Sequence, residues 1–175
     1  MKNIILVGFM GTGKSTVAQL LAKQLNRVLV ETDTVIEKQM KKSVANIFAE
    51  YGERGFRKLE RSVVITISHK KSLIISCGGG TILDKHNLND LEKSGHLICL
   101  TASLASILKR LEGCKNRPLY SANAASFEKL YGERQKAYAF VKIQIDTDNC
   151  TPQQVVDKII EIVKPSKNKD KNPLL

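Results

Sequence analysis

The stretch that decides the fold is Gly8-Phe9-Met10-Gly11-Thr12-Gly13-Lys14-Ser15, which directly follows the apolar run Ile4-Ile5-Leu6-Val7. It matches the pattern G-x-x-x-x-G-K-[ST], whose glycines let the backbone turn tightly and direct successive N–H groups at an anion. Residues 14–25 then place apolar side chains at helical spacing. The positive end of that helix dipole would lie beneath the same anion. We therefore predict a strand, a phosphate-binding loop and a helix that bind a nucleoside triphosphate.

Each side chain of this loop has an expected role. Lys14 would reach the β- and γ-phosphates, and the Ser15 hydroxyl would be a ligand of Mg²⁺. The other loop residues expected to bind the nucleotide are Gly11, Thr12, Gly13 and Thr16. The competing interpretation is a glycine-rich turn that only packs closely.

The bulk composition describes a globular protein. The 175 residues suit a single domain, with 42% hydrophobic and 26% charged residues. No apolar run approaches the ~20 residues that a membrane span needs. The first strand begins directly after Met1-Lys2-Asn3, so we expect no signal peptide. The four cysteines are scattered without ligand spacing and the three histidines are isolated, as in a cytoplasmic protein with reduced thiols.

The formal net charge of +11 indicates anionic partners but does not choose among them. One candidate is a nucleotide together with an anionic substrate, and another is a non-enzymatic, nucleotide-dependent switch that binds RNA or protein. Aromatic residues make up 5% of the chain, include no Trp and are not interleaved with basic residues, so we expect no nucleic-acid partner. Residues 164–175 read as a polar basic tail.

Short apolar runs alternate with amphipathic stretches along the chain. The predicted strands are Asn3–Val7, Val28–Val30, Leu73–Ser76, His96–Leu100 and Lys142–Asp146. The predicted helices are 14–25, 34–40, 44–69, 84–93, 103–111, 126–140 and 152–163. This alternation predicts a three-layer α/β fold, in which helices cover both faces of a central five-stranded parallel sheet. Residues 1–163 would form one domain, with a mobile lid over about 112–125.

Acidic residues follow the second predicted strand at Glu31-Thr32-Asp33. Carboxylates at the carboxyl end of a strand beside the phosphate loop are suited to positioning Mg²⁺ through water, or to accepting the proton of an attacking hydroxyl. The alternative is a helix start, with Asp33 or Thr34 as N-cap and Thr34-Val35-Ile36-Glu37 as a capping box. On position alone the two interpretations stay open.

Three further features have a structural and a functional interpretation each. Arg57 follows Glu53 at i,i+4, as on any exposed helix, but an arginine also suits an anionic substrate. Gly78-Gly79-Gly80 allows close backbone approach, to a ligand or to a neighbouring loop. Arg117 in the expected lid and Arg134 on the next helix suit charge developing on transferring phosphates, although an arginine in a loop can also be solvated.

Taken together, these elements resemble the shikimate kinase family from Asn3 to about Val163. The family pattern is a G-x-x-G-x-G-K-[ST]-T loop, D-x-D, G-E-x-x-F-R-x-x-E, G-G-G, R-P-L and a later E-R. The matching stretches here are Gly8 to Thr16, Glu31-Thr32-Asp33, Gly52 to Glu60, Gly78-Gly79-Gly80, Arg117-Pro118-Leu119 and Glu133-Arg134. The phosphate loop occurs in many unrelated enzymes, whereas the G-E-x-x-F-R-x-x-E segment joined to G-G-G is far more specific.

The resemblance implies an ATP- and Mg²⁺-dependent kinase that phosphorylates the 3-hydroxyl of shikimate in aromatic amino-acid biosynthesis, acting as a cytoplasmic monomer. Asp33 would bind the ring hydroxyls and act as base, while Arg57 and Arg134 would hold the carboxylate. The backbone of Gly78, Gly79 and Gly80 would close around the ring. On the nucleotide side, Arg117 would be the lid arginine on the phosphates, Arg110 would stack on adenine, and the segment around Pro152 would cover its other face.

The chain departs from the family pattern at two points. The first acid of D-x-D is Glu31, one methylene longer, in the position implied for the metal. Lys136-Ala137 replaces the usual Pro-Leu before Tyr138, with Arg134 still in register. The alternative function is another small-molecule kinase of the same architecture, acting on gluconate or a nucleoside monophosphate.

Overall fold

A computed structural model describes residues 1–112 and 124–164 of the chain. Its centre is a parallel sheet of five strands, as the sequence predicts, and the strand order in the structure is β2-β3-β1-β4-β5. The strands are β1 (Asn3–Val7), β2 (Leu29–Glu31), β3 (Ile74–Ser76), β4 (Gly95–Thr101) and β5 (Ile143–Asp146). Both ends of β2 lie one residue later than predicted, so Glu31 is the last residue of the strand and does not follow it.

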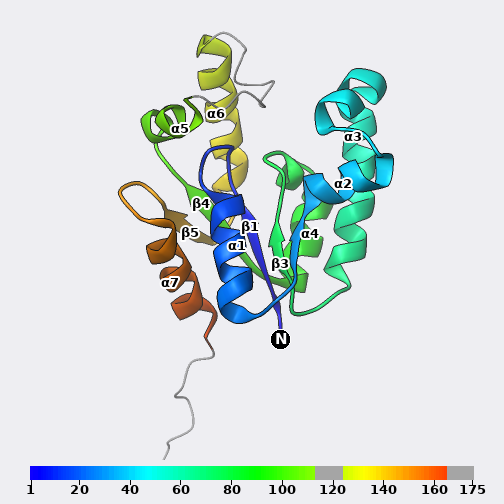
Figure 1. The fold of residues 1–175 in the computed structure, drawn as a ribbon. Coiled ribbons are helices and arrows are strands. Elements are labelled where there is room, and N and C mark those ends of the chain that lie inside the picture. The colour runs from blue at the N-terminus through cyan, green and yellow to red at the C-terminus, as the bar shows by residue number, and fades with distance from the viewer. Residues whose placement is uncertain (113–123, 165–175) are drawn as a thin grey trace, which may run out of the picture.

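Helices cover both faces of this sheet. They are α1 (Lys14–Leu25), α2 (Thr32–Met40), α3 (Val44–Ser68), α4 (Lys85–Ser94), α5 (Leu104–Leu111), α6 (Ala124–Tyr138) and α7 (Pro152–Val163), with a short 3₁₀ turn η1 (Thr81–Leu83) that was not predicted. Ile4 and Leu6 of β1 pack with α1 and α7 on one face. Ile5 and Val7 belong to the cluster on the other face, together with α3 and α6 (Figure 1). The predicted three-layer arrangement is therefore confirmed.

Helix α3 differs from the uninterrupted helix predicted for 44–69. Gly52 has non-helical angles (φ 64, ψ 178), so the helix kinks there into two segments. The rings of Phe48 and Phe56 stack across the kink with their centroids 4.5 Å apart. A residue other than glycine would be strained at this φ. The second segment carries Arg57.

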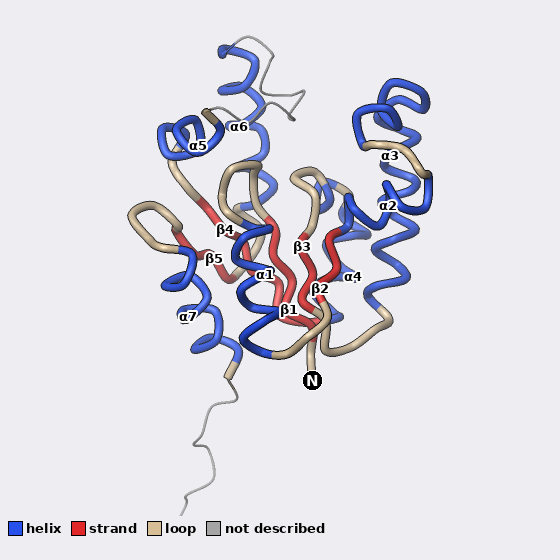
Figure 2. Tube along the Cα trace, in the orientation of Figure 1, coloured by secondary structure: helices blue, strands red, loops and turns tan. Residues whose placement is uncertain are grey.

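The parallel register brings distant loops to one edge of the sheet. Ser76 is paired with both Leu6 and Glu31, so the segments that follow β1, β2 and β3 begin at the same level. In Figure 2 the loops after β1 and β3 lie beside each other, at the end of the sheet opposite the N-terminus. This is the edge where parallel α/β sheets bind their ligands.

Two predicted segments lie largely outside the described residues. The expected lid over 112–125, which contains Arg117, is described only at its two ends, and the tail after Lys164 is not described. Among the residues that the structure describes, no helix is long and apolar enough to cross a membrane.

Candidate active site

The phosphate loop has the backbone conformation that its glycines predict. Gly8, Gly11 and Gly13 have φ angles of 139, 80 and 92, in the region that side chains rarely adopt. A Cβ on Gly8 would also collide with the backbone carbonyl of Leu100. The loop therefore depends on glycine for its backbone path.

The start of α1 behind this loop suits an anion. Its N-cap, Gly13, has no side-chain cap, and its first turn contains no acidic residue. Ser15 and Thr16 are exposed in that first turn. The exposed N–H groups and the helix dipole provide the positive end that a phosphate needs.

Thr12 and Lys14 fold back onto the loop itself. The Thr12 hydroxyl, on a residue only 1% exposed, donates to the Phe9 carbonyl at 2.8 Å. The Lys14 ammonium donates to the same carbonyl at 2.9 Å. Of the predicted nucleotide-binding residues, Thr12 thus has its side chain turned into the protein, where it supports the shape of the loop.

Glu31 and Ser15 are the residues implied for the metal. Glu31 ends β2 and is the N-cap of α2, but its side chain makes no cap hydrogen bond. No group of three or more His, Cys, Asp or Glu side chains suited to a metal occurs within residues 1–112 and 124–164. A Mg²⁺ ion on these two residues would therefore need further oxygen ligands, which phosphates and water supply.

Asp33 is not the cap of a helix. Helix α2 begins at Thr32, so Asp33 lies in its first turn, and the Glu37 carboxylate accepts from the backbone N–H of Val44 at 2.9 Å. The proposed N-cap and capping box are therefore wrong. The cause is a tertiary bond, because the Thr32 hydroxyl accepts from the Gly78 N–H at 2.9 Å as the chain leaves the sheet.

The Asp33 carboxylate occupies an unfavourable environment. Its Oδ1 is buried and has no hydrogen-bond partner in the described part of the chain. Burial raises the pKa of Asp33, Glu60 and Glu37 raise it further by repulsion, and Lys14 and Arg57 partly oppose them. A buried, unpartnered carboxylate oxygen near both Lys14 and Arg57 is suited to accepting a proton from a ligand.

The three glycines after β3 lie in contact with the predicted acceptor residues. A Cβ on Gly78 would lie 2.5 Å from Asp33 Oδ1, and a Cβ on Gly80 would lie 2.7 Å from Arg57 Cζ. At Gly79 the nearest atom would be the Met10 nitrogen of the phosphate loop, 3.8 Å away. The segment therefore lies between the predicted acceptor residues, Asp33 and Arg57, and the phosphate loop.

Arg57 makes two ion pairs within α3. It forms the expected i,i+4 pair with Glu53, at 3.1 Å, and it also donates to Glu60 Oε2 at 2.7 Å. Burial lowers the pKa of Arg57, but Glu60 and Glu53 outweigh this effect and the net shift is upward. The guanidinium remains charged and is held at the edge of Gly80.

Glu60 is a site residue to which the sequence analysis gave no role. It is 1% exposed, and its second oxygen lies 2.7 Å from the Thr81 hydroxyl. A buried carboxylate of this kind needs partners, and Arg57 and Thr81 supply them. The signal was present in the sequence, because Glu60 falls at helical spacing among the buried Phe56, Val63 and Val64.

Arg134 lies on α6, the last helix before β5. The buried Tyr138, four residues later, donates to the Gly79 carbonyl at 2.5 Å. Burial raises the pKa of Tyr138, while the charges of Arg134 and Arg57 act in the opposite direction. The two arginines implied for a carboxylate therefore both lie near this phenol.

Arg110 contacts the phosphate loop. Its guanidinium donates to the Thr147 hydroxyl at 2.9 Å, to the Thr147 carbonyl at 2.7 Å and to the Gly11 carbonyl at 3.3 Å. It thus bridges the phosphate loop and the segment between β5 and α7. That segment ends at the exposed Pro152, the first residue of α7, behind the Thr151 cap.

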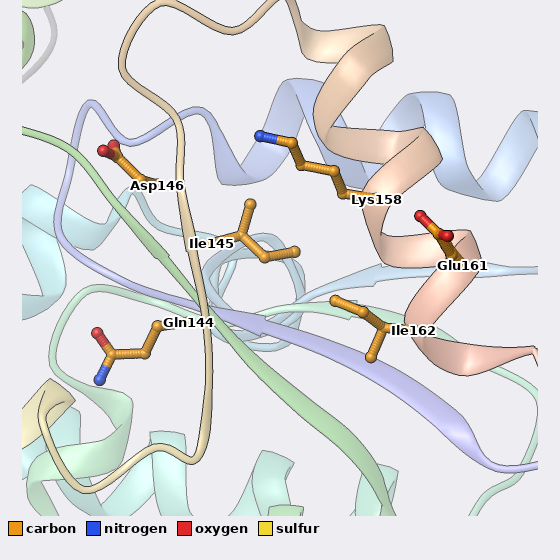
Figure 3. A pocket seen from close by; sticks show the side chains of 6 residues that line it. All are labelled: Gln144, Ile145, Asp146, Lys158, Glu161 and Ile162. Atoms are coloured by element: carbon orange, nitrogen blue, oxygen red, sulfur yellow. The ribbon is translucent and has the colours of Figure 1, made fainter.

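A depression of about 320 Å³ lies elsewhere, between β5 and α7 (Figure 3). Its lining residues are Gln144, Ile145, Asp146, Lys158, Glu161 and Ile162. None of the predicted site residues is among them, so the candidate active site is the edge where the phosphate loop, Asp33, Arg57 and the three glycines meet.

Comparisons with known proteins agree with this geometry. A family model for shikimate kinase matches residues 10–164. A shikimate kinase of Sulfurihydrogenibium sp. (strain YO3AOP1) is 39% identical over 164 residues, which are 94% of this chain and 99% of that protein. One from Thermodesulfovibrio yellowstonii is 40% identical over 163 residues, 92% of this chain and 94% of that protein.

A solved structure leads to the same family. The shikimate kinase from Acinetobacter baumannii in complex with shikimate is similar with a TM-score of 0.89 and 31% identity. The similarity covers 97% of this chain and 96% of that chain. The present chain belongs to the shikimate kinase family.

Proposed function

We propose that this chain transfers the γ-phosphoryl group of ATP to the 3-hydroxyl of shikimate, giving shikimate 3-phosphate and ADP. The observation that carries the proposal is the meeting of a buried, unpartnered Asp33 oxygen with Arg57 at Gly78–Gly80, beside the phosphate loop. The shikimate bound to the Acinetobacter baumannii relative supports the choice of acceptor. The reaction would be a cytoplasmic step of aromatic amino-acid biosynthesis, carried out by a monomer.

On the nucleotide side, Lys14 and the N–H groups of the loop would hold the phosphates and stabilise the charge that develops during transfer. Ser15, and Glu31 through water, would hold a Mg²⁺ ion, which would supply positive charge against the negative charge of the phosphates. Arg110 and the segment at Pro152 would lie against adenine, since Arg110 already bridges the phosphate loop and Thr147. Arg117, which lies outside the described residues, would come from the lid.

On the acceptor side, Arg57 and Arg134 would hold the carboxylate, because guanidinium pairs with planar oxyanions in a bidentate manner. The backbone of Gly79 and Gly80 would lie against the ring. Asp33 would orient the reacting hydroxyl and accept its proton as it attacks in line. Its raised pKa brings the acceptor strength of this carboxylate closer to that needed near neutral pH.

A coupled ADP-release assay tests the proposal. Mg·ATP would be supplied with shikimate, with gluconate, with nucleoside monophosphates or with no acceptor. We expect ADP release that depends on shikimate alone. Release with gluconate or a nucleoside monophosphate and none with shikimate would reject the acceptor, and ATP binding without turnover on any acceptor would favour a nucleotide-dependent switch.

The carboxylate clamp is tested separately by Arg57→Ala and Arg134→Ala. Each should raise KM for shikimate steeply, by about tenfold or more, because each removes a charge-assisted hydrogen bond. KM for ATP should change far less. A KM for shikimate that hardly moves in either variant would show that the clamp has been misplaced.

A further inference from the structure

Three helices contribute charged residues to the acceptor side, and each is tied to the Gly78–Thr81 segment. In α2, Thr32 beside Asp33 accepts from the Gly78 N–H at 2.9 Å. In α3, Glu60 beside Arg57 lies 2.7 Å from the Thr81 hydroxyl, which also lies 3.0 Å from the Gly78 carbonyl. The third tie comes from α6, the helix of Arg134.

The tie from α6 is the phenol of Tyr138. Its oxygen lies 2.5 Å from the Gly79 carbonyl oxygen, and the residue is 2% exposed. A carbonyl has no proton to give, so the phenol is the donor. Because residues four apart lie on one face of a helix, Arg134 and Tyr138 are neighbours along α6.

We propose that Tyr138 is a positioning residue, whose hydrogen bond to Gly79 sets the place of Arg134 relative to Arg57 and so controls affinity for the carboxylate of the acceptor. This inference rests on the proposed role of Arg134. It adds that the position of the Arg134 guanidinium depends on a contact that does not touch the substrate. Tyr138 contributes neither charge nor proton to the reaction.

Two other aromatic residues of α6 contact different loops. Phe127 and Tyr131 pack edge-to-face on Phe9 of the phosphate loop, with centroids 5.4 and 5.5 Å apart. The Tyr131 hydroxyl donates to the Ala102 carbonyl at 2.9 Å, beyond the end of β4. Tyr131 is therefore a matched control, since it is a phenol on the same helix bonded to a different backbone carbonyl.

The first experiment compares Tyr138→Phe with Tyr131→Phe. Both keep the ring and its packing and remove one hydroxyl. We expect Tyr138→Phe to raise KM for shikimate about fivefold, the effect of one hydrogen bond, with KM for ATP unchanged within twofold. Tyr131→Phe should leave KM for shikimate within twofold. Equal increases in both variants, or a parallel increase in both KM values of Tyr138→Phe, would overturn the proposal in favour of general loosening of α6.

The second experiment places Tyr138→Phe in an Arg134→Ala background. If Tyr138 acts through Arg134, the double variant should have the same KM for shikimate as Arg134→Ala alone. Additive effects would overturn the positioning role. The single variants separate the two failures. An Arg134→Ala variant with normal KM would reject the clamp, whereas a raised KM there with a normal Tyr138→Phe would reject the positioning role alone.

Discussion

The two glycine-rich loops of the site lie side by side and use glycine for different physical reasons. In the phosphate loop, Gly8, Gly11 and Gly13 all have positive φ, so the backbone path itself requires glycine. The second loop is Gly78–Gly80, which we call the acceptor loop after its proposed role, and none of its three glycines has positive φ. There the missing Cβ leaves room for side chains, those of Asp33 at Gly78 and Arg57 at Gly80.

This difference implies different consequences of mutation. Changes in the phosphate loop should strain the backbone and lower stability, whereas changes in the acceptor loop should displace charged side chains and lower affinity for the acceptor. Two glycine-rich segments that follow strands of the same sheet can therefore need glycine for different structural reasons.

We expect the largest effect from a substitution of Asp33, the carboxylate beside Gly78 in the acceptor loop. Asp33→Asn should lower kcat by about 10²–10⁴-fold, the usual loss on removal of a general base, with ATP binding retained. Steady-state kinetics and a titration with an ATP analogue measure the two. The control is Asp157→Asn on the exposed face of α7, which should behave as wild type. Full activity of Asp33→Asn would remove this residue from the mechanism.

The backbone requirement of the phosphate loop is tested by Gly8→Ala. The new Cβ meets the Leu100 carbonyl and the φ of 139 strains any side chain, so we expect a loss of about 3 kcal/mol of unfolding free energy. Thermal unfolding should show a fall in Tm of roughly 6–12 °C. Gly132→Ala is the control, because a Cβ in that helix meets nothing within 4 Å. A Gly8→Ala variant as stable as Gly132→Ala would contradict the distinction between the loops.

The side-chain support of the acceptor loop is tested by Glu60→Gln. Loss of this buried charge weakens the 2.7 Å pair that holds Arg57, and we expect KM for shikimate to rise about tenfold. The exposed partner provides the comparison, since Glu53 is 64% exposed at its side chain and Glu53→Gln should change KM by less than about twofold. Equal effects of the two variants would show that burial of Glu60 does not matter for the clamp.

The smallest effect concerns stability and pH. The pKa of Asp33 is raised in the folded protein, so the unfolded chain releases this proton more readily. Ionisation of Asp33 therefore lowers the stability of the folded state as the pH rises above the ordinary pKa of an aspartate. Asp33→Asn should therefore be more stable than wild type at neutral pH, by about 1 kcal/mol for relief of a buried, unpartnered group. The difference should vanish at acidic pH. A variant that is less stable at neutral pH would contradict the raised pKa.

Much of the fold followed from the sequence because its signals are local. Hydrophobic runs and helical spacing identified every strand and α-helix of the described residues to within a few positions. The kink in α3 was missed because one glycine inside a helical pattern is usually tolerated. The start of α2 was misplaced because the bond between Thr32 and Gly78, residues 46 apart, outweighed local capping preference.

The phosphate loop and the acceptor residues also differ in how far the sequence alone predicts them. The phosphate loop is one contiguous octapeptide, so its role could be predicted from the residues themselves. Asp33, Arg57, Gly79 and Arg134 are far apart in sequence, and only the family resemblance indicated that they act together. Thr81 and Tyr138 had no role assigned, because hydrogen bonds to groups distant in sequence, the Glu60 carboxylate for Thr81 and the Gly79 carbonyl for Tyr138, leave no periodic signal.

Gly80→Ala is the most direct test of the different use of glycine in the two loops. Shikimate and a non-hydrolysable ATP analogue would be titrated separately into wild type and the variant by calorimetry, with Tm measured alongside. The three atoms nearest to a Cβ at this position all belong to the flexible end of Arg57. We therefore expect the affinity for shikimate to fall about tenfold or more, with the affinity for the analogue and Tm little changed. A parallel loss of both affinities together with a large fall in Tm, or unchanged shikimate binding, would contradict it.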